Sequence, residues 1–177
     1  NIFVKQITNN PNIKFHVIKE GETLSLGDKT LVFYPAPFLH WPDSMFTYVK
    51  EDKVLFTCDF LGCHYCETEI IDTKLKSYDN YLKAMRSYFD FIFGPFKPYV
   101  IKGLDIIKKL DVDMICPSHG PVLTTTKTIA AAIDNYDKWA HENNTDLTGV
   151  VPIFYVTAYG YTERIALAIA EEIKACG

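Results

Sequence analysis

Alternating apolar and polar residues in the first third of the chain predict β-strands. Apolar side chains occupy every second position at Ile13, Phe15 and Val17, and again at Leu24 and Leu26. This spacing places them on one face of an extended strand. The same reasoning predicts strands at three later places: Thr30 to Tyr34, a hairpin of Met45 to Val49 with Val54 to Thr57, and Asp113 to Cys116.

Helical spacing dominates the middle of the chain. Between Leu75 and Ile92 apolar residues recur at intervals of three and four, which is one face of an amphipathic helix that Gly94 and Pro95 end. Further helices are predicted over 100–110 and 129–140. Predicted strands and predicted helices both occur in this part of the chain, so a mixed α/β composition is expected.

A polar, turn-rich stretch from Glu142 to Thr148 predicts a linker, which divides the chain into domains 1–147 and 148–177. Beyond it, the continuous apolar run Val150 to Val156 predicts a strand whose two faces are both covered, as in a parallel sheet. The helix expected next carries an apolar packing stripe at Ile165, Ile169 and Ile173.

Composition narrows the classes of function. The chain has 177 residues, 48% of them hydrophobic, with a formal charge of -4 and a pI of about 5.7. No basic surface therefore predicts nucleic-acid binding. The longest apolar runs are far shorter than the roughly 20 residues that cross a bilayer, so we expect no membrane span. Five cysteines without the density of a disulfide scaffold favour a reducing, cytoplasmic compartment.

Three potential metal ligands each follow the end of a predicted strand. They are His40, Asp59 and His119. Loops at one rim of a sheet can bring such distant residues together on a rigid support. Taken singly, each residue is more often an ordinary loop or capping residue, so the residue types alone leave metal binding open.

The remaining histidines and the lone C-x-x-C carry weaker signals. His16 is expected to be solvated, and His141 suits the negative end of a helix dipole. His64 lies five residues after Asp59 and could support a metal ligand. Cys63 and Cys66 lack the second pair that a zinc or rubredoxin-type site requires, so we interpret them as ordinary thiols.

A second candidate site is the turn between the predicted strand at Val150 to Val156 and the following helix. Its residues are Thr157, Ala158, Tyr159, Gly160, Tyr161 and Thr162. Backbone N–H groups at a helix start, hydroxyl donors and a glycine are the elements of a phosphate site. The turn contains no lysine, which excludes a nucleotide-triphosphate P-loop. An ordinary turn with a threonine cap remains the alternative.

Three sequence strings resemble the flavodiiron proteins (A-type flavoproteins): Phe38 to Tyr48, Asp59 to Gly62 and Ser118 to Pro121. The separations of 19 and 60 residues between His40, Asp59 and His119 also agree with that family's pattern. The resemblance implies the C-terminal part of an αββα metallo-β-lactamase-like sandwich, followed by the first strand and helix of a flavodoxin-like domain.

The same resemblance implies two iron ions and FMN. His40 would ligate one iron, His119 the other, and Asp59 would bridge them, while the turn at 157–162 would hold the FMN phosphate. The family's H-x-E-x-D ligand motif does not occur in these 177 residues. We therefore expect this chain by itself to bind metal weakly or not at all. The loops that would enclose the flavin ring are expected beyond Gly177, so we expect no tight FMN binding by this chain alone.

The activity implied is reduction of dioxygen to water, of nitric oxide to nitrous oxide, or both, in a cytoplasmic protein. Electrons would come from a donor such as rubredoxin or its reductase, and subunits would pair head to tail in a dimer or tetramer. One alternative is a hydrolase of the metallo-β-lactamase superfamily that acts on an ester or thioester. Another is an electron-transfer or docking module without a working metal site.

Overall fold

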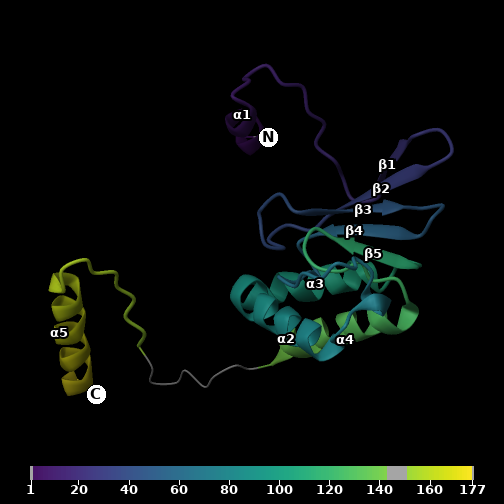
Figure 1. Cartoon of the computed structure of the whole chain (residues 1–177). Coiled ribbons are helices and arrows are strands. Elements are labelled where there is room, and N and C mark those ends of the chain that lie inside the picture. Colours follow the sequence, from purple (N-terminus) through teal and green to yellow (C-terminus); the bar gives the residue numbers. More distant parts are fainter. Residues whose placement is uncertain (1, 143–150, 177) are drawn as a thin grey trace. The chain divides into compact units, whose positions relative to one another are not determined.

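In the computed structural model, which describes residues 2–142 and 151–176, five strands form one sheet in the order β1-β2-β3-β4-β5 (Figure 1). The strands are β1 Glu22–Ser25, β2 Thr30–Pro35, β3 Met45–Val49, β4 Val54–Cys58 and β5 Met114–Pro117. Neighbours from β1 to β4 run antiparallel, and β5 runs parallel to β4. Consequently β2, β4 and β5 all point the same way, and their carboxyl ends lie at one edge of the sheet.

Three helices cover one face of this sheet, as Figure 1 shows. They are α2 Tyr78–Tyr88, α3 Lys97–Ile107 and α4 Thr126–His141. Alternation along β4 explains the choice of face, because Leu55 and Thr57 are buried whereas Phe56 is 47% exposed. The described residues thus form one sheet and one helical layer of the expected αββα arrangement.

Aromatic and aliphatic side chains from the sheet and the helices form one core between the sheet and the helical layer. Its fully buried members include Phe46, Leu55, Phe60, Met85, Phe89, Phe93, Leu104, Ile115 and Tyr136. The Phe60 ring packs edge-on against Phe93 and Tyr136, with centroids 5.6 and 5.3 Å apart. Edge-to-face pairs of this kind add to the stability gained from burial.

The long helix predicted from Leu75 to Ile92 begins and ends differently in the structure. α2 begins at Tyr78, where the Ser77 side chain accepts a hydrogen bond from the Asn80 N–H, so Leu75 precedes the helix. After Tyr88 the chain widens into a π-helical turn, η2 Phe89–Phe93, and then a 3-10 turn, η3 Gly94–Phe96. The wider turn shifts the side-chain period, which a pattern based on 3.6 residues per turn cannot anticipate.

The predicted strand at Ile13, Phe15 and Val17 is wrong. Residues 13–19 are neither strand nor helix, and Phe15 and Val17 are 41% and 67% exposed. The chain begins instead with α1 Ile2–Thr8. A strand is stable only beside a partner, and no described residue pairs with this segment.

The predicted strand from Val150 to Val156 is also absent over its described part. Residues 151–157 pair with no described strand, and Phe154 and Val156 are each 92% exposed. The helix that follows is present as α5 Tyr161–Cys176. Its predicted packing stripe is uncovered, with Ile165 61% exposed and only Ala166 buried.

The chain divides into two units, Asn1–Glu142 and Asn143–Gly177. The predicted boundary between 147 and 148 falls within residues 143–150, outside the described part of the chain, and stays a prediction. Of the helices within the described ranges, none combines the length and apolar character needed to cross a membrane.

Candidate metal centre and phosphate-binding turn

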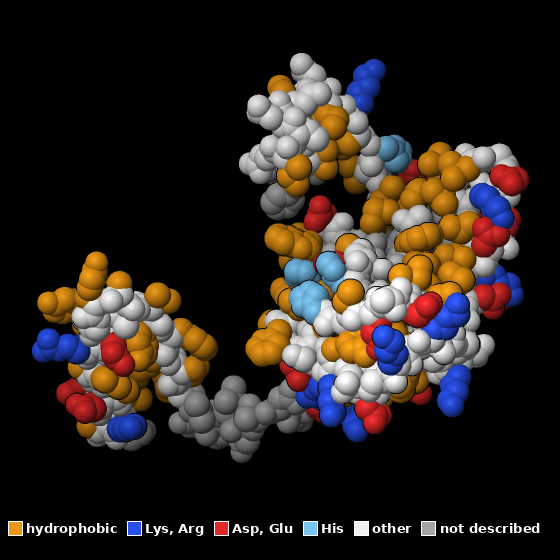
Figure 2. All heavy atoms as spheres, viewed as in Figure 1, with side chains coloured by type: hydrophobic (Ala, Val, Ile, Leu, Met, Phe, Trp, Pro, Cys, Tyr) orange, Lys and Arg blue, Asp and Glu red, His pale blue; other side chains and the backbone are white. Residues whose placement is uncertain are grey.

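The three predicted ligands lie where β2, β4 and β5 end. His40 is in the loop after β2, Asp59 directly follows β4, and His119 is in the loop after β5. Because these strands share a direction, residues far apart in the sequence meet at one edge of the sheet. Histidine side chains gather on one face of this unit, bordered by hydrophobic side chains (Figure 2).

The two imidazoles approach different oxygens of one carboxylate. His40 Nε2 lies 3.1 Å from Asp59 Oδ2, and His119 Nε2 lies 3.3 Å from Asp59 Oδ1. Asp59 is only 8% exposed. Burying a carboxylate costs free energy unless positive charge or hydrogen-bond donors face it. The two imidazoles can supply such groups, one at each Asp59 oxygen.

A strained turn presents Asp59 to the two imidazoles. Cys58 and Leu61 on either side have positive φ angles of 54° and 63°, which cost a non-glycine residue roughly 1–3 kcal/mol. The turn is held by the Phe60 N–H donating to Thr57 O and the Thr57 hydroxyl donating to Phe60 O, at 3.1 and 2.7 Å. Strain that is retained by local hydrogen bonds often marks a functional position.

Hydrogen bonds also fix the loop that carries His40. The Phe38 N–H donates to Trp41 O at 2.7 Å, and the Ser44 hydroxyl donates to Leu39 O at 2.9 Å. The His40 ring packs edge-on against buried Phe93, with centroids 6.2 Å apart. The imidazole therefore loses little freedom when its Nε2 binds a ligand.

Tyr88 is a site residue that the sequence analysis missed. Its ring lies 4.7 Å from His64 and 6.1 Å from His119, centroid to centroid, and it is 4% exposed. Burial and the nearby Asp59 carboxylate raise the pKa of its hydroxyl, which therefore stays protonated and can donate. In the sequence Tyr88 resembles any other helix residue, so no local signal could have identified it.

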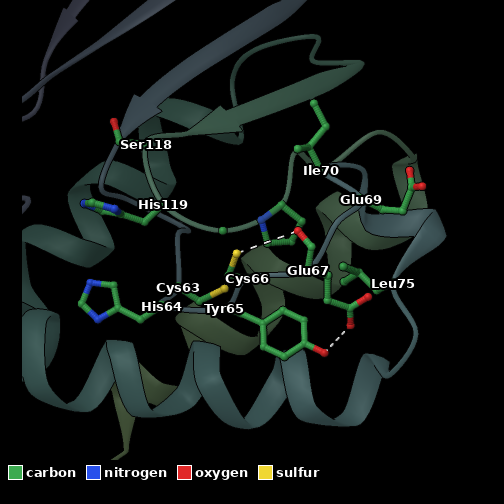
Figure 3. Close-up of a pocket in the computed structure, with 12 residues that line it drawn as sticks. Cys63, His64, Tyr65, Cys66, Glu67, Glu69, Ile70, Leu75, Ser118 and His119 are labelled. Carbon is green, nitrogen blue, oxygen red and sulfur yellow. Dashed lines mark hydrogen bonds between the residues drawn. The ribbon is translucent and has the colours of Figure 1, made fainter.

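His64, the weaker candidate from the sequence, also lies at this site. Its ring stands edge-on to His119 at 5.4 Å and to Tyr88 at 4.7 Å. It shares with His119 the wall of a cavity of about 530 Å³ (Figure 3). No hydrogen bond joins the two imidazoles among the described residues, so His64 contacts His119 by packing.

The separations at Asp59 are compatible with one metal ion beside each oxygen of the carboxylate. Two ligand atoms that sit about 2.1 Å from one ion are roughly 3 Å apart when adjacent in its coordination sphere. Each imidazole nitrogen and its facing Asp59 oxygen have this separation. Among the described residues no group of three or more His, Cys, Asp or Glu side chains is placed to hold a metal ion. Each ion would thus take one imidazole and one carboxylate oxygen from this chain and need further ligands.

The turn before α5 fits the phosphate end of a flavin. Gly160 has a φ of +81°, and an added Cβ there would meet nothing within 4 Å, so the backbone is open to a ligand. The Gly160 N–H donates to the Thr157 hydroxyl oxygen at 2.8 Å, which holds the turn and leaves the Thr157 hydroxyl hydrogen free to donate. α5 begins at Tyr161, so the positive end of its dipole faces this space.

Comparison with known proteins identifies the family. Residues 1–120 match the protein family described as ODP family beta lactamase. The chain is 50% identical over 174 residues to flavo-diiron protein FprA2 of Clostridium acetobutylicum, covering 98% of this chain and 43% of that protein. It is 37% identical to the anaerobic nitric oxide reductase flavorubredoxin of Klebsiella pneumoniae, covering 92% of this chain and 33% of that protein.

A solved structure shows the same fold. Rubredoxin oxygen:oxidoreductase from Desulfovibrio gigas superimposes with a TM-score of 0.75 at 29% identity, over 97% of this chain and 42% of that one. The chain thus spans less than half the length of these relatives. The predicted resemblance and the metallo-β-lactamase-like fold class are confirmed. The chain belongs to the ODP β-lactamase-like family and, within it, to the flavodiiron proteins, which carry FMN and a non-haem diiron centre.

Proposed function

We propose that this chain is part of a flavodiiron oxidoreductase that reduces dioxygen to water, nitric oxide to nitrous oxide, or both. The observation that carries the proposal is the buried Asp59 carboxylate, with His40 Nε2 facing one oxygen and His119 Nε2 facing the other. The names of its relatives support this class of reaction, since they include an oxygen oxidoreductase and a nitric oxide reductase.

Each candidate ligand would have its own role at the metal site. Asp59 would bridge two iron ions, with His40 on one and His119 on the other. The remaining ligands would come from residues outside this chain, which contains no H-x-E-x-D motif. A bound diiron centre, with FMN, would supply the electron transfer that reduction of a diatomic molecule requires.

The protein's own contribution is to fix these groups and limit water. Phe93 and the core behind it exclude solvent from one side of the His40 ring. Tyr88 offers a protonated hydroxyl on the side of Asp59. This hydroxyl would be available to donate a hydrogen bond at the site.

The turn formed by Thr157, Ala158, Tyr159, Gly160, Tyr161 and Thr162 would bind the FMN phosphate. A donor such as rubredoxin or its reductase would deliver electrons to the flavin in the cytoplasm. A head-to-tail dimer or tetramer would bring the flavin of one subunit to the iron site of another.

The test uses the full-length protein purified without oxygen. Iron and FMN are counted, and dioxygen and nitric oxide consumption are followed with a rubredoxin reductase system. We expect His119→Ala to abolish both reactions while FMN stays bound. His141→Ala, which changes an exposed histidine at the end of α4, should keep them. Activity that survives in His119→Ala would contradict the proposal.

The hydrolase alternative uses the same residues for a different purpose, through a metal-bound hydroxide. The assays above separate the two, because a hydrolase would cleave ester or thioester substrates without FMN or an electron donor. Turnover of such substrates by iron-loaded protein, without gas consumption, would favour the hydrolase.

A further inference from the structure

The loop that carries His119 faces a second segment across a cavity. Cys63 to Leu75 form one wall of the cavity of about 530 Å³, and Ser118 to Pro121 form the other (Figure 3). Where a cavity separates two segments, side-chain packing cannot fix the distance between them. Contacts at the two ends of the cavity therefore contribute to their relative position, in addition to the hydrogen bonds that join Ser118 to Cys58 and Leu123 to Ile115.

The near end is held at His119 itself. The Cys63 N–H donates to His119 O at 3.2 Å. Gly120 lies so close to Cys63 that an added Cβ would be 2.6 Å from the Cys63 Sγ. The backbone around His119 is thus pressed against Cys63 and has little room to adjust by itself.

The far end is held by the buried carboxylate of Asp72, which is 3% exposed. Asp72 Oδ1 accepts hydrogen bonds from the Thr124 N–H at 3.2 Å and the Thr124 hydroxyl at 2.7 Å. The Asp72 N–H donates to Val122 O at 3.0 Å, and the Val122 N–H donates to Ile70 O at 2.7 Å. Asp72, near the end of the first segment, is thereby joined to Val122 and Thr124, which directly follow the second segment.

We propose that Asp72 is a positioning residue for the metal centre, which holds His119 opposite Asp59 by clamping the 118–124 loop at Thr124. Only four residues lie between Thr124 and His119, so a shift at the Asp72–Thr124 contact has a short path along the chain to the imidazole. This inference rests on the proposed function, because it assigns the clamp to the metal that His119 would bind.

A second feature supplies the matched control. Among the described residues two buried side-chain atoms have no hydrogen-bond partner, Asp72 Oδ2 and the Tyr81 hydroxyl. Tyr81 is 2% exposed and lies on α2. Tyr81→Phe removes a buried polar atom from this region. It leaves in place every hydrogen bond that joins Asp72 to Val122 and Thr124.

The experiment compares Asp72→Ala, Asp72→Asn, Thr124→Val and Tyr81→Phe in the full-length protein. The first readout is iron bound per chain and the affinity for the more weakly held ion. We expect Asp72→Ala to weaken one of the two ions about 10–100-fold, the range found when groups that support a metal ligand are removed. Asp72→Asn keeps an acceptor oxygen, so it should bind iron more tightly than Asp72→Ala does. Tyr81→Phe should bind iron as tightly as the wild-type protein. Thr124→Val, which loses only the hydroxyl bond, should lie between.

The second readout is amide hydrogen exchange in metal-free protein, which does not depend on iron. A clamp that positions His119 predicts faster exchange at the Cys63 and Ser118 amides in Asp72→Ala. A purely local role predicts faster exchange only at Asp72, Val122 and Thr124, and that result would overturn the inference. Should Asp72→Ala fail to fold, Thr124→Val decides by the same two measurements.

The two proposals fail in different ways. Wild-type protein that binds no iron would refute the proposed function, while the exchange pattern would still report on the clamp. Wild-type protein with two irons, and Asp72→Ala with the same two at unchanged affinity, would refute only the role of Asp72.

Discussion

At the scale of single residues, the site depends on backbone conformations that only certain side chains tolerate. Gly120 directly follows His119 and has a φ of +84°, a conformation that L-residues rarely adopt. Its neighbour is the Cys63 thiol, which is buried. Both conditions require the absence of a side chain, so Gly120 fixes how closely the His119 loop approaches Cys63.

We predict that Gly120→Ala lowers the free energy of unfolding by about 2–4 kcal/mol, because strain at positive φ adds to overpacking against Cys63. Gly21→Ala is the control. Gly21 also has a positive φ, of 73°, but an added Cβ there meets nothing within 4 Å. It should cost only about 1–2 kcal/mol from the φ strain. Urea denaturation of both variants measures the difference, and equal losses would contradict the packing argument.

Burial of Cys63 links stability to alkaline pH. It raises the pKa of this thiol from an ordinary value of 9.0 to about 12. Between these values the unfolded chain has lost the thiol proton while the folded chain keeps it. The stability contribution is therefore complete below pH 9 and is lost as pH rises toward 12.

We accordingly expect wild-type protein to lose more stability than Cys63→Ser when the pH is raised through this window. The measurement is the free energy of unfolding in urea at a series of pH values. Cys66→Ser, which changes an exposed thiol three residues away, is the matched control. Parallel curves for wild type and Cys63→Ser would show that this thiol does not titrate in the window.

At the scale of elements, helix α4 supports the turn that presents Asp59. The buried Tyr136 hydroxyl on α4 donates to Gly62 O at 3.3 Å, directly after that turn. The Thr125 side chain caps the helix by accepting a hydrogen bond from the Thr128 N–H at 3.1 Å. The position of α4 is thus fixed at its start by a local cap and in its middle by a contact with the site.

Removal of the cap should weaken the helix without touching the site. Thr125→Ala is expected to cost about 1 kcal/mol, the usual value for a lost N-cap, and Thr125→Ser should restore most of it. Thermal unfolding of the two variants tests this. A loss that Thr125→Ser does not restore would show that the methyl group, rather than the hydroxyl, matters at this position.

At the scale of the whole molecule, both units leave apolar surface uncovered within the described residues. Phe56 on the sheet face opposite the helices is 47% exposed, and Leu24 is 50% exposed. In the other unit Ile165 and Phe154 are exposed as well. Exposed apolar side chains in such number favour further protein surface against these faces.

The candidate metal site also needs more ligands than the described residues supply. With one imidazole and one carboxylate oxygen for each ion, we expect the isolated 177-residue chain to lose its iron on dialysis, whereas the full-length protein retains it. Iron analysis before and after dialysis provides the measurement. Stoichiometric iron in the dialysed 177-residue chain would contradict a need for ligands from elsewhere.

Much of the local structure could be predicted from the sequence. The hairpin β3–β4, the strands β2 and β5 and the helices α3, α4 and α5 follow from side-chain periodicity, which is encoded within each segment. The predicted strands at 13–17 and 150–156 are wrong where the structure describes them. Periodicity shows that a segment could be a strand, but a strand also needs a partner, which the segment itself does not encode.

Side-chain periodicity was enough to predict most helices and strands, and the sequence motifs were enough to predict the family and a strand-end position for each candidate ligand. The fold was needed to show that β2, β4 and β5 run in the same direction, so that His40, Asp59 and His119 meet. It alone placed Tyr88 beside the site and Asp72 at the end of the His119 loop. The physical reason is that these contacts join segments separated by tens of residues, and their geometry depends on how the sheet and helices pack rather than on neighbours in the chain.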